Sequence, residues 1–399
     1  IGAVAIGLAG LFLVKYMSDA GLLGPGTRIM LGLVCGAGLA GAGEWLRRKP
    51  AQRRFAALKP DYVSQALTAG GLATVFASLY AANALYGFIG PTVTFATLAA
   101  TALAAFALSV VQGPMVAIVG LLGGFVLPVL IGSAEPFAPG LFTYLGLLFA
   151  AVCAVMIWRP ALWLAVSATI LASGWVVLWS NSFFYHGDGL TLGLFAALIG
   201  TGFAFAGAIA SSDDHPAVWQ PPIWPKDTLQ IAGLVAGTVA MALLLIVLVR
   251  DGYGNGSLIA LAVFAVAACG AAVRAQRFDF QVLIAGLGVL LGFAEWGGRL
   301  HVEGWIDGWL VPGEIAWGPE PSAEAGAYMT FSAAFAGAAL VTGYGVLWRS
   351  VRPWVWATLG SLVPIGLMIS AYATLRLLEP SHNWAFAALG LAALFVLLA

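Results

Sequence analysis

The sequence predicts an all-α protein, a polytopic transmembrane helical bundle of about fourteen spans. The chain is 61% hydrophobic and only 9% charged, and its mean hydropathy is +0.97. Residues 62–134 contain no Asp, Glu, Lys or Arg. Because a soluble domain carries roughly 25% charged residues, this composition excludes a soluble globular protein, a disordered chain and a nucleic-acid binder.

The spans follow from the length that a helix needs to cross a bilayer. About 20 mostly apolar residues cover ~30 Å of hydrocarbon, since unpaired backbone groups are not left in lipid. Charged or Pro/Gly-rich breaks separate such runs along the whole chain. The predicted spans are 1–17, 27–46, 63–86, 91–111, 114–132, 138–157, 161–180, 189–210, 229–250, 256–273, 280–298, 326–348, 354–375 and 383–399.

The basic residues predict an orientation. Loops on one side of the predicted membrane carry twelve of the 17 Lys and Arg residues, and loops on the other side carry five. Lys and Arg are retained on the cytoplasmic side, so both ends of this chain are expected in the cytoplasm. The sorting also supports the span count, because an error of one span would mix the two groups.

Four regions are expected along the chain. Residues 1–61 form a first helical hairpin and a basic cytoplasmic loop, and 62–210 form a six-span unit. Residues 211–228 are a Pro-rich cytoplasmic connector, and 229–399 form a second six-span unit with an outer loop at 299–325. Matching segments, such as 120–125 with 288–293, indicate a parallel repeat of spans 3–8 and 9–14.

Two spans at corresponding places in these units contain helix-weakening residues. The fifth predicted span contains Gly123, Gly124 and Pro128, and the eleventh contains Gly292 and then Glu295, Trp296, Gly297 and Gly298. Glycine adds backbone freedom and proline removes a hydrogen-bond donor, so we expect both helices to be interrupted near their outer ends. Interrupted helices in two halves indicate a transporter binding site. The alternative is that these glycines only permit close helix packing.

A few ionisable residues lie near or within spans. Glu295 is the most lipid-embedded acid, and Arg299 follows one turn later. An intramembrane ionisable residue is a candidate functional group, although an i,i+4 ion pair between these two also explains them. Lys15, Asp19 and Glu44 are further candidates. Here too a structural role is open, with Lys15 extending outward beside Asp19 and Glu44 paired with the arginines that follow it.

Patterns for enzymes and cofactors are largely missing. The sequence has no GxxxxGK[ST] motif and no HExxH motif. Cys35, Cys153 and Cys269 lie in separate apolar runs, so we interpret them as packing residues and expect no metal and no cofactor. The outer loop holds His301, Glu303 and Asp307. These leave open a transferase acting at the outer side.

The beginning of the chain resembles a family of bacterial predicted membrane proteins, domain of unknown function 2339. The matching residues are Phe12–Tyr16, Asp19, Gly24–Pro25, Arg28, Gly43–Glu44 and Gly120–Pro128. The resemblance is best over residues 1–180. It implies a bacterial inner-membrane setting and marks Lys15, Asp19, Arg28, Glu44 and Pro128 as family-pattern positions. It implies no activity.

Three functions are compatible with the sequence. The first is a transporter or flippase-like carrier without its own ATPase, favoured by the many spans and the predicted repeat. The second is a non-catalytic membrane scaffold in envelope biogenesis, favoured by the scarcity of intramembrane charge. The third is the outer-side transferase. The expected partners are the lipid bilayer, other envelope proteins and a small-molecule or lipid-linked substrate, with no nucleic acid.

Overall fold

The computed structural model describes residues 24–48, 60–132, 137–185, 187–210, 227–306, 323–375 and 383–398. Within these ranges the protein is all-helical, as predicted, with thirteen α-helices and no strand. Ten of these helices are long and apolar enough to span a membrane. The first predicted span, 1–17, lies outside the described residues.

The described helices follow the predicted spans closely. Their bounds are α2 (Pro25–Arg48), α3 (Pro60–Ala84), α4 (Pro91–Gln112), α5 (Pro114–Ile131), α6 (Ala138–Trp158), α7 (Leu162–Ser182), α8 (Gly189–Ala210), α9 (Thr228–Arg250), α10 (Asn255–Arg274), α11 (Phe280–Ile306), α12 (Ala323–Leu347), α13 (Pro353–Leu375) and α14 (Asn383–Leu398). A short 3-10 helix, η1 (Gln276–Phe278), precedes α11.

Local sequence explains where many helices begin. Proline is the first residue of α2, α3, α4, α5 and α13, where its missing N–H costs nothing and its fixed φ suits a helix. Helix α9 begins differently. The Asp227 side chain accepts a hydrogen bond from the Gln230 backbone N–H at 2.8 Å, and the Gln230 side chain accepts one in return from the Asp227 N–H at 3.3 Å. This reciprocal pair is a capping box.

The contacts divide the chain into two compact units, residues 1–135 and 136–399. In the first unit, α2 packs along α3, α4 packs along α5, and α3 contacts both α4 and α5. Helices α2 and α3 approach closely at Gly36 and Gly71, where an added Cβ on either residue would reach the backbone of the other helix. Small residues permit such backbone contact in a membrane.

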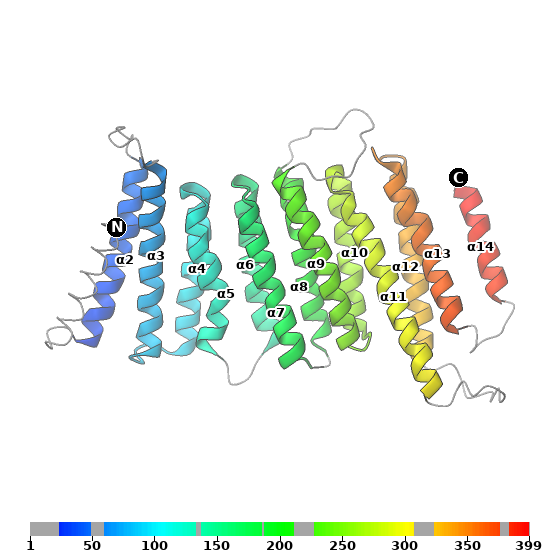
Figure 1. Ribbon diagram of the computed structural model, residues 1–399, viewed down its shortest axis with the longest axis horizontal. Helices are drawn as coiled ribbons and strands as arrows, with labels where there is room; N and C mark the ends of the chain where they lie inside the picture. Colours follow the sequence, from blue (N-terminus) through cyan, green and yellow to red (C-terminus); the bar gives the residue numbers. More distant parts are fainter. Residues whose placement is uncertain are drawn as a thin grey trace. The chain divides into compact units, whose positions relative to one another are not determined.

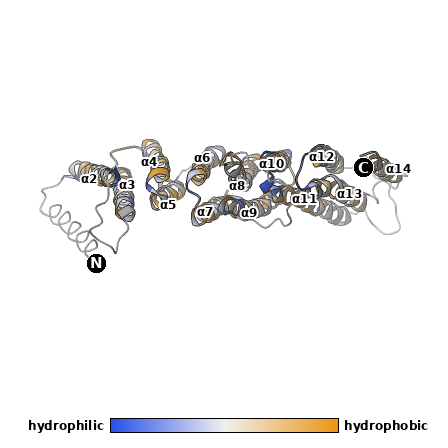
Figure 2. Ribbon diagram, turned by 90° about the horizontal axis from the view of Figure 1, so that it is seen from above, coloured by the Kyte–Doolittle hydropathy of each residue, from blue (hydrophilic) through white to orange (hydrophobic). Residues whose placement is uncertain are grey.

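The second unit consists of two layers of helices. Helices α6, α8, α10 and α12 form one row, and α7, α9, α11 and α13 form the other (Figure 2). Each helix is antiparallel to its chain neighbour, so all helices within a row point the same way (Figure 1). Large buried side chains of this unit include Phe149, Phe203, Phe264 and Phe278. Helix contacts both within a row, as between α8 and α10, and between rows, as between α8 and α9, form its core.

The two ends of the second unit differ in charge. Five arginines lie in or beside the connections at the end where α6, α8, α10 and α12 finish: Arg159, Arg274, Arg277, Arg349 and Arg352. We name this the basic end, and the other the opposite end. The positive-inside rule predicts that the basic end is cytoplasmic. That orientation and the parallel six-span repeat stay predictions.

The helices that were expected to be interrupted are continuous. Helix α5 passes through Pro128 to Ile131, and α11 passes through Gly297 and Gly298 to Ile306. The expected interruption is therefore wrong in both. Proline is tolerated inside a membrane helix because neighbouring groups satisfy the freed backbone atoms. Because α11 continues to Ile306, the first residues of the predicted outer loop 299–325 are helical.

Candidate functional site

The most distinct feature of the second unit is a break in one of its rows. Helix α6 packs along α8, and α8 packs along α10, but α10 and α12 touch at only a few positions. Between them lies a cavity of about 660 Å³, open at the side and floored by α11 and α13. This volume falls within the ~300–1,000 Å³ of ligand pockets. We name it the α10–α12 groove.

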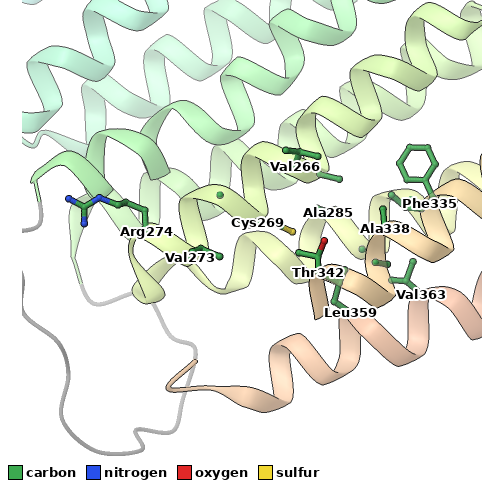
Figure 3. Close-up of a pocket in the computed structure, with 15 residues that line it drawn as sticks. Val266, Cys269, Val273, Arg274, Ala285, Phe335, Ala338, Thr342, Leu359 and Val363 are labelled. Carbon is green, nitrogen blue, oxygen red and sulfur yellow. The ribbon is translucent and has the colours of Figure 1, made fainter. Parts of the chain in front are cut away.

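The lining of the groove is almost entirely apolar. It consists of Ala265, Val266, Cys269, Gly270, Val273 and Arg274 from α10, Ala285, Gly286 and Val289 from α11, Phe335, Ala338, Ala339 and Thr342 from α12, and Leu359 and Val363 from α13 (Figure 3). Arg274 is the one charged lining residue. It lies at the end of the row of lining residues, and its guanidinium extends away from them (Figure 3).

Two arginines flank the groove at the basic end. Arg274 is the last residue of α10, and Arg349 follows the end of α12. Both are exposed, and neither side chain makes an ion pair or hydrogen bond with another described residue. The Gln276 side chain donates to the Arg349 carbonyl oxygen at 3.2 Å, which ties the segment after α10 to the segment after α12.

A buried carboxylate lies behind this end of the groove. Asp279 is fully buried, and the nearest cation is Arg352, whose Nη1 lies 3.6 Å from Asp279 Oδ2. The Arg352 Nη1 also donates to the Gln276 carbonyl oxygen at 3.2 Å. Neither Asp279 oxygen accepts a hydrogen bond from a described residue. Because a buried charge is costly without a partner, Arg352 is essential to this arrangement.

A second polar set joins α8, α9 and α11. Arg277 donates to Asp227 Oδ2 at 2.9 Å and to the Gly207 carbonyl oxygen at 2.6 Å. The buried Gln281 side chain donates to the carbonyl oxygens of Gly200 and Gly233. In low dielectric such bonds fix the helices in one register, because each lost bond would leave a buried polar group unpaired. The N-terminal segment of α11 is thus hydrogen-bonded to both α8 and α9.

Aromatic side chains lie at and beyond the end of the groove that is away from the basic end. Phe335 lines the groove and contacts Phe293, with ring centroids 5.5 Å apart. Phe293 in turn contacts Trp296 at 5.7 Å and Tyr328 at 5.6 Å. The Tyr328 hydroxyl lies 2.8 Å from Ser370 Oγ. We name Phe293, Trp296, Tyr328 and Phe335 the aromatic cluster. Edge-on and tilted ring contacts of this kind stabilise helix packing.

The aromatic cluster continues to the turn between α9 and α10. Tyr253 in that turn stacks on Trp296 with centroids 5.1 Å apart and planes 2° apart. Its φ of 59° is in the left-handed region, which a bulky residue rarely adopts. Burial raises the pKa of the Tyr253 hydroxyl, the Glu295 carboxylate raises it further, and Arg299 opposes the rise. Glu295 and Arg299, two of the residues predicted from the sequence, therefore influence the Tyr253 hydroxyl electrostatically.

The structure places the predicted residues of α11 on different faces. Gly292 is buried, and an added Cβ would contact Leu248 and Leu245 of α9 at 3.4 and 3.6 Å. Glu295 and Arg299 are exposed at the opposite end of the helix, outside the groove. Arg299 lies 3.9 Å from the position of an added Cβ on Gly252.

The remaining predicted residues belong to the first unit or lie outside the described ranges. Glu44 accepts hydrogen bonds from Arg47 at 2.7 and 2.9 Å, from Arg48 at 2.8 Å and from Gln112 at 3.1 Å. These contacts match the structural alternative for Glu44. In α5, an added Cβ on Gly123 would press on the Phe76 ring, Gly124 is buried and Pro128 is half-buried. Lys15 and Asp19 lie outside the described residues.

Sequence reasoning missed the groove and the polar set beside it. The groove residues are ordinary span residues, so no sequence signal marks them. Asp279 and Gln281 had a weak signal, because they are polar residues at the start of an apolar run, two and four residues after Arg277. Their full burial depends on the segments that cover them, which periodicity does not identify.

Comparison with known families adds one decisive finding. The profile of a family described as predicted membrane protein (DUF2339) matches residues 1–399. The chain belongs to the DUF2339 family. The match extends over the whole chain, well beyond the first 180 residues where the resemblance was expected to be best. Searches of curated proteins and of solved structures returned no match.

For this DUF2339 protein, membership agrees with the ten spanning helices, so it is a membrane protein. Family membership assigns no chemistry to it. Among the described residues of the DUF2339 protein, no group of three His, Cys, Asp or Glu side chains is placed to hold a metal ion. Its candidate site is therefore the α10–α12 groove, with arginines at one end and the aromatic cluster at the other.

Proposed function

We propose that the protein is a flippase-like carrier that moves an amphiphile across the bacterial inner membrane without its own ATPase. The apolar part of the amphiphile lies in the α10–α12 groove. Its polar part travels between the basic end and the opposite end. In this proposal both ends of the chain face the cytoplasm, in agreement with the distribution of Lys and Arg.

The observation that carries the proposal is a side opening that stops inside the protein. The groove is open at its side between α10 and α12, and Phe335 of the aromatic cluster lines its end away from the basic end. A carrier needs a site that is accessible from one side and closed toward the other. The aromatic cluster supplies such a closure between the groove and the Tyr253 turn.

The charges on α11 support the same proposal. Asp279 lies at the basic end of this helix, and Glu295 and Arg299 lie at the opposite end. The intervening helix surface floors the groove. Charged residues within or near spans mark pathways for polar groups in membrane proteins. Helix α11 therefore joins two polar regions by an apolar path.

The test is reconstitution of the purified chain into vesicles that contain a small fraction of fluorescent phosphatidylglycerol. A membrane-impermeant reductant bleaches only the label in the outer leaflet. If the protein moves lipid, label from the inner leaflet is bleached as well, at a rate that rises with the amount of protein. Protein-free vesicles provide the baseline.

Two phenylalanine variants make this test specific. Gly270 lines the groove, and an added Cβ there meets nothing within 4 Å, so Gly270→Phe fills the groove without a clash at Cβ. Gly337 on the other face of α12 also has open space, and Gly337→Phe is the matched control. We expect the first variant to abolish inner-leaflet bleaching and the second to retain it. Bleaching no faster than in protein-free vesicles would refute the carrier and favour the scaffold.

A further inference from the structure

We infer that the α10–α12 groove is a binding site for an anionic phospholipid from the leaflet at the basic end. One acyl chain lies between α10 and α12, and the phosphate lies beside Arg274 and Arg349. This inference rests on the proposed function, because it names the cargo class of the same groove. It adds a headgroup selectivity that a carrier of amphiphiles does not require.

The length of the groove fits one leaflet. Along α10 its lining runs from Ala265 and Val266 to Arg274 at the helix end. Eight residues of α-helix rise about 12 Å, and half of a hydrocarbon core of ~30 Å is about 15 Å. The groove thus extends from the basic end to near the middle of the span, where Phe335 lines it. An acyl chain anchored at that interface occupies the same depth.

The chemistry of the lining selects a hydrocarbon chain. Apart from Arg274 at the end, only Cys269 and Thr342 bring a side-chain heteroatom to the groove. Sugars, peptides and nucleotides would leave their polar groups unpaired against such a surface. A chain of methylene groups has no hydrogen bonds to lose there, and the small residues Gly270, Ala338 and Ala339 leave space for it.

The charges at the basic end of the groove, which we call its mouth, select an anion. Four arginines lie near this end of the groove, and two of them are engaged by carboxylates: Arg277 by Asp227 and Arg352 by Asp279. Arg274 and Arg349 have no such partner among the described residues. Asp227 and Asp279 are the only acids in the described turns at this end of the second unit. Two cations therefore remain for a phosphate, which arginine binds well.

An exposed tryptophan places this mouth at headgroup level. Trp348 adjoins Arg349 and is 79% exposed. Tryptophan favours the interface between hydrocarbon and headgroups, where its ring is in apolar surroundings and its N–H reaches water. Arg349 is therefore at the depth of lipid phosphates. Basic residues near the surface attract anionic lipids there.

The experiment is native mass spectrometry of the full chain, purified and exposed to equal amounts of phosphatidylglycerol and phosphatidylcholine. We expect phosphatidylglycerol adducts to predominate. Arg274→Gln and Arg349→Gln should each reduce this preference by about fivefold, the effect of one basic residue near an anionic lipid. Gly270→Phe should remove the adducts of both lipids. Arg250→Gln, at the opposite end, is the matched control and should keep the preference.

Each outcome decides between the two proposals. Equal binding of the two lipids, or a preference that survives both arginine substitutions, overturns the anionic site even if vesicles show lipid movement. A preference that depends on Arg274 and Arg349 while vesicles show no movement supports the site and refutes the carrier. Adducts that persist in Gly270→Phe place the lipid elsewhere on the protein and also overturn the inference.

Discussion

The two faces of α10 pack in opposite ways. Toward α8 its residues are buried, and the two helices approach closely where Gly200 of α8 meets Phe264. Toward α12 its residues line an open groove, and Val266 is 72% exposed. Both faces consist of small and apolar side chains. Hydrophobicity alone therefore does not decide which helix contacts close up.

The close contact between α8 and α10 depends on glycines of α8 against which a side chain of α10 packs. At Gly193 an added Cβ would collide with Ala260, and at Gly200 it would lie 2.6 Å from the Phe264 ring. In lipid, helix association relies on such van der Waals fit, since there is no hydrophobic force between helices. A glycine opposite a larger side chain provides that fit. Helix α8 is consequently the most buried of the ten spanning helices.

The open contact has no such pairs. Gly270 of α10 lines the groove and has nothing within 4 Å of an added Cβ, so no side chain of α12 packs against this position. The helices around the groove are joined by polar bonds at the basic end, from Gln276 to Arg349 and from Arg352 to Asp279, and by the aromatic cluster beyond the other end. The comparison shows that one helix can pack closely on one face and line an open groove on the other.

The largest effect on stability is expected from loss of the ion pair between Arg352 and Asp279, at the basic end of the α10–α12 groove. Arg352→Leu would leave Asp279 as an uncompensated buried charge and should reduce the free energy of unfolding by about 3–5 kcal/mol. Unfolding of the purified protein in mixed micelles, followed by loss of helical signal, measures this. The double variant Asp279→Leu with Arg352→Leu should recover most of the loss. If both proteins are equally destabilised, the ion pair is not the cause.

An intermediate effect is expected from overfilling the closed contact. Gly200→Leu would press on Phe264 and on Ala240, whose Cβ lies 2.8 Å from the added atom. Overpacking of this kind costs about 1–3 kcal/mol. The matched control is Gly174→Leu, because Gly174 is exposed on α7 and has open space around it. The same unfolding measurement applies, and a Gly200→Leu protein as stable as the control would contradict the close approach.

The smallest effect on stability is expected at the open contact. Gly270→Phe fills free space and removes a helix-interior glycine, so stability should stay the same or rise by less than ~1 kcal/mol. Its consequence is instead the loss of lipid binding. A marked destabilisation by Gly270→Phe would mean that α10 and α12 close over this position in the membrane.

The span pattern was predictable because it depends on chain composition. Runs of apolar residues with starting prolines set α4 and α5 within a few residues of their predicted bounds. The ion pairs of Glu44 also followed from local spacing, since Arg47 and Arg48 lie one turn away on the same helix. Interruption of α5 and α11 was wrongly expected, because tertiary neighbours decide whether a Gly or Pro breaks a membrane helix.

The sequence by itself determined that this is a membrane protein, which segments are apolar helices and at which end of the second unit its arginines gather. Low charge and the ~20-residue period of the apolar runs decide these, because bilayer thickness acts on each helix separately. Only the tertiary structure decided that α8 packs closely against α10 while α12 makes few contacts with it, and that Asp279 is buried beside Arg352. Those outcomes depend on the fit between helices that are distant in the chain. The apolar character of a residue does not specify which of these helices it packs against.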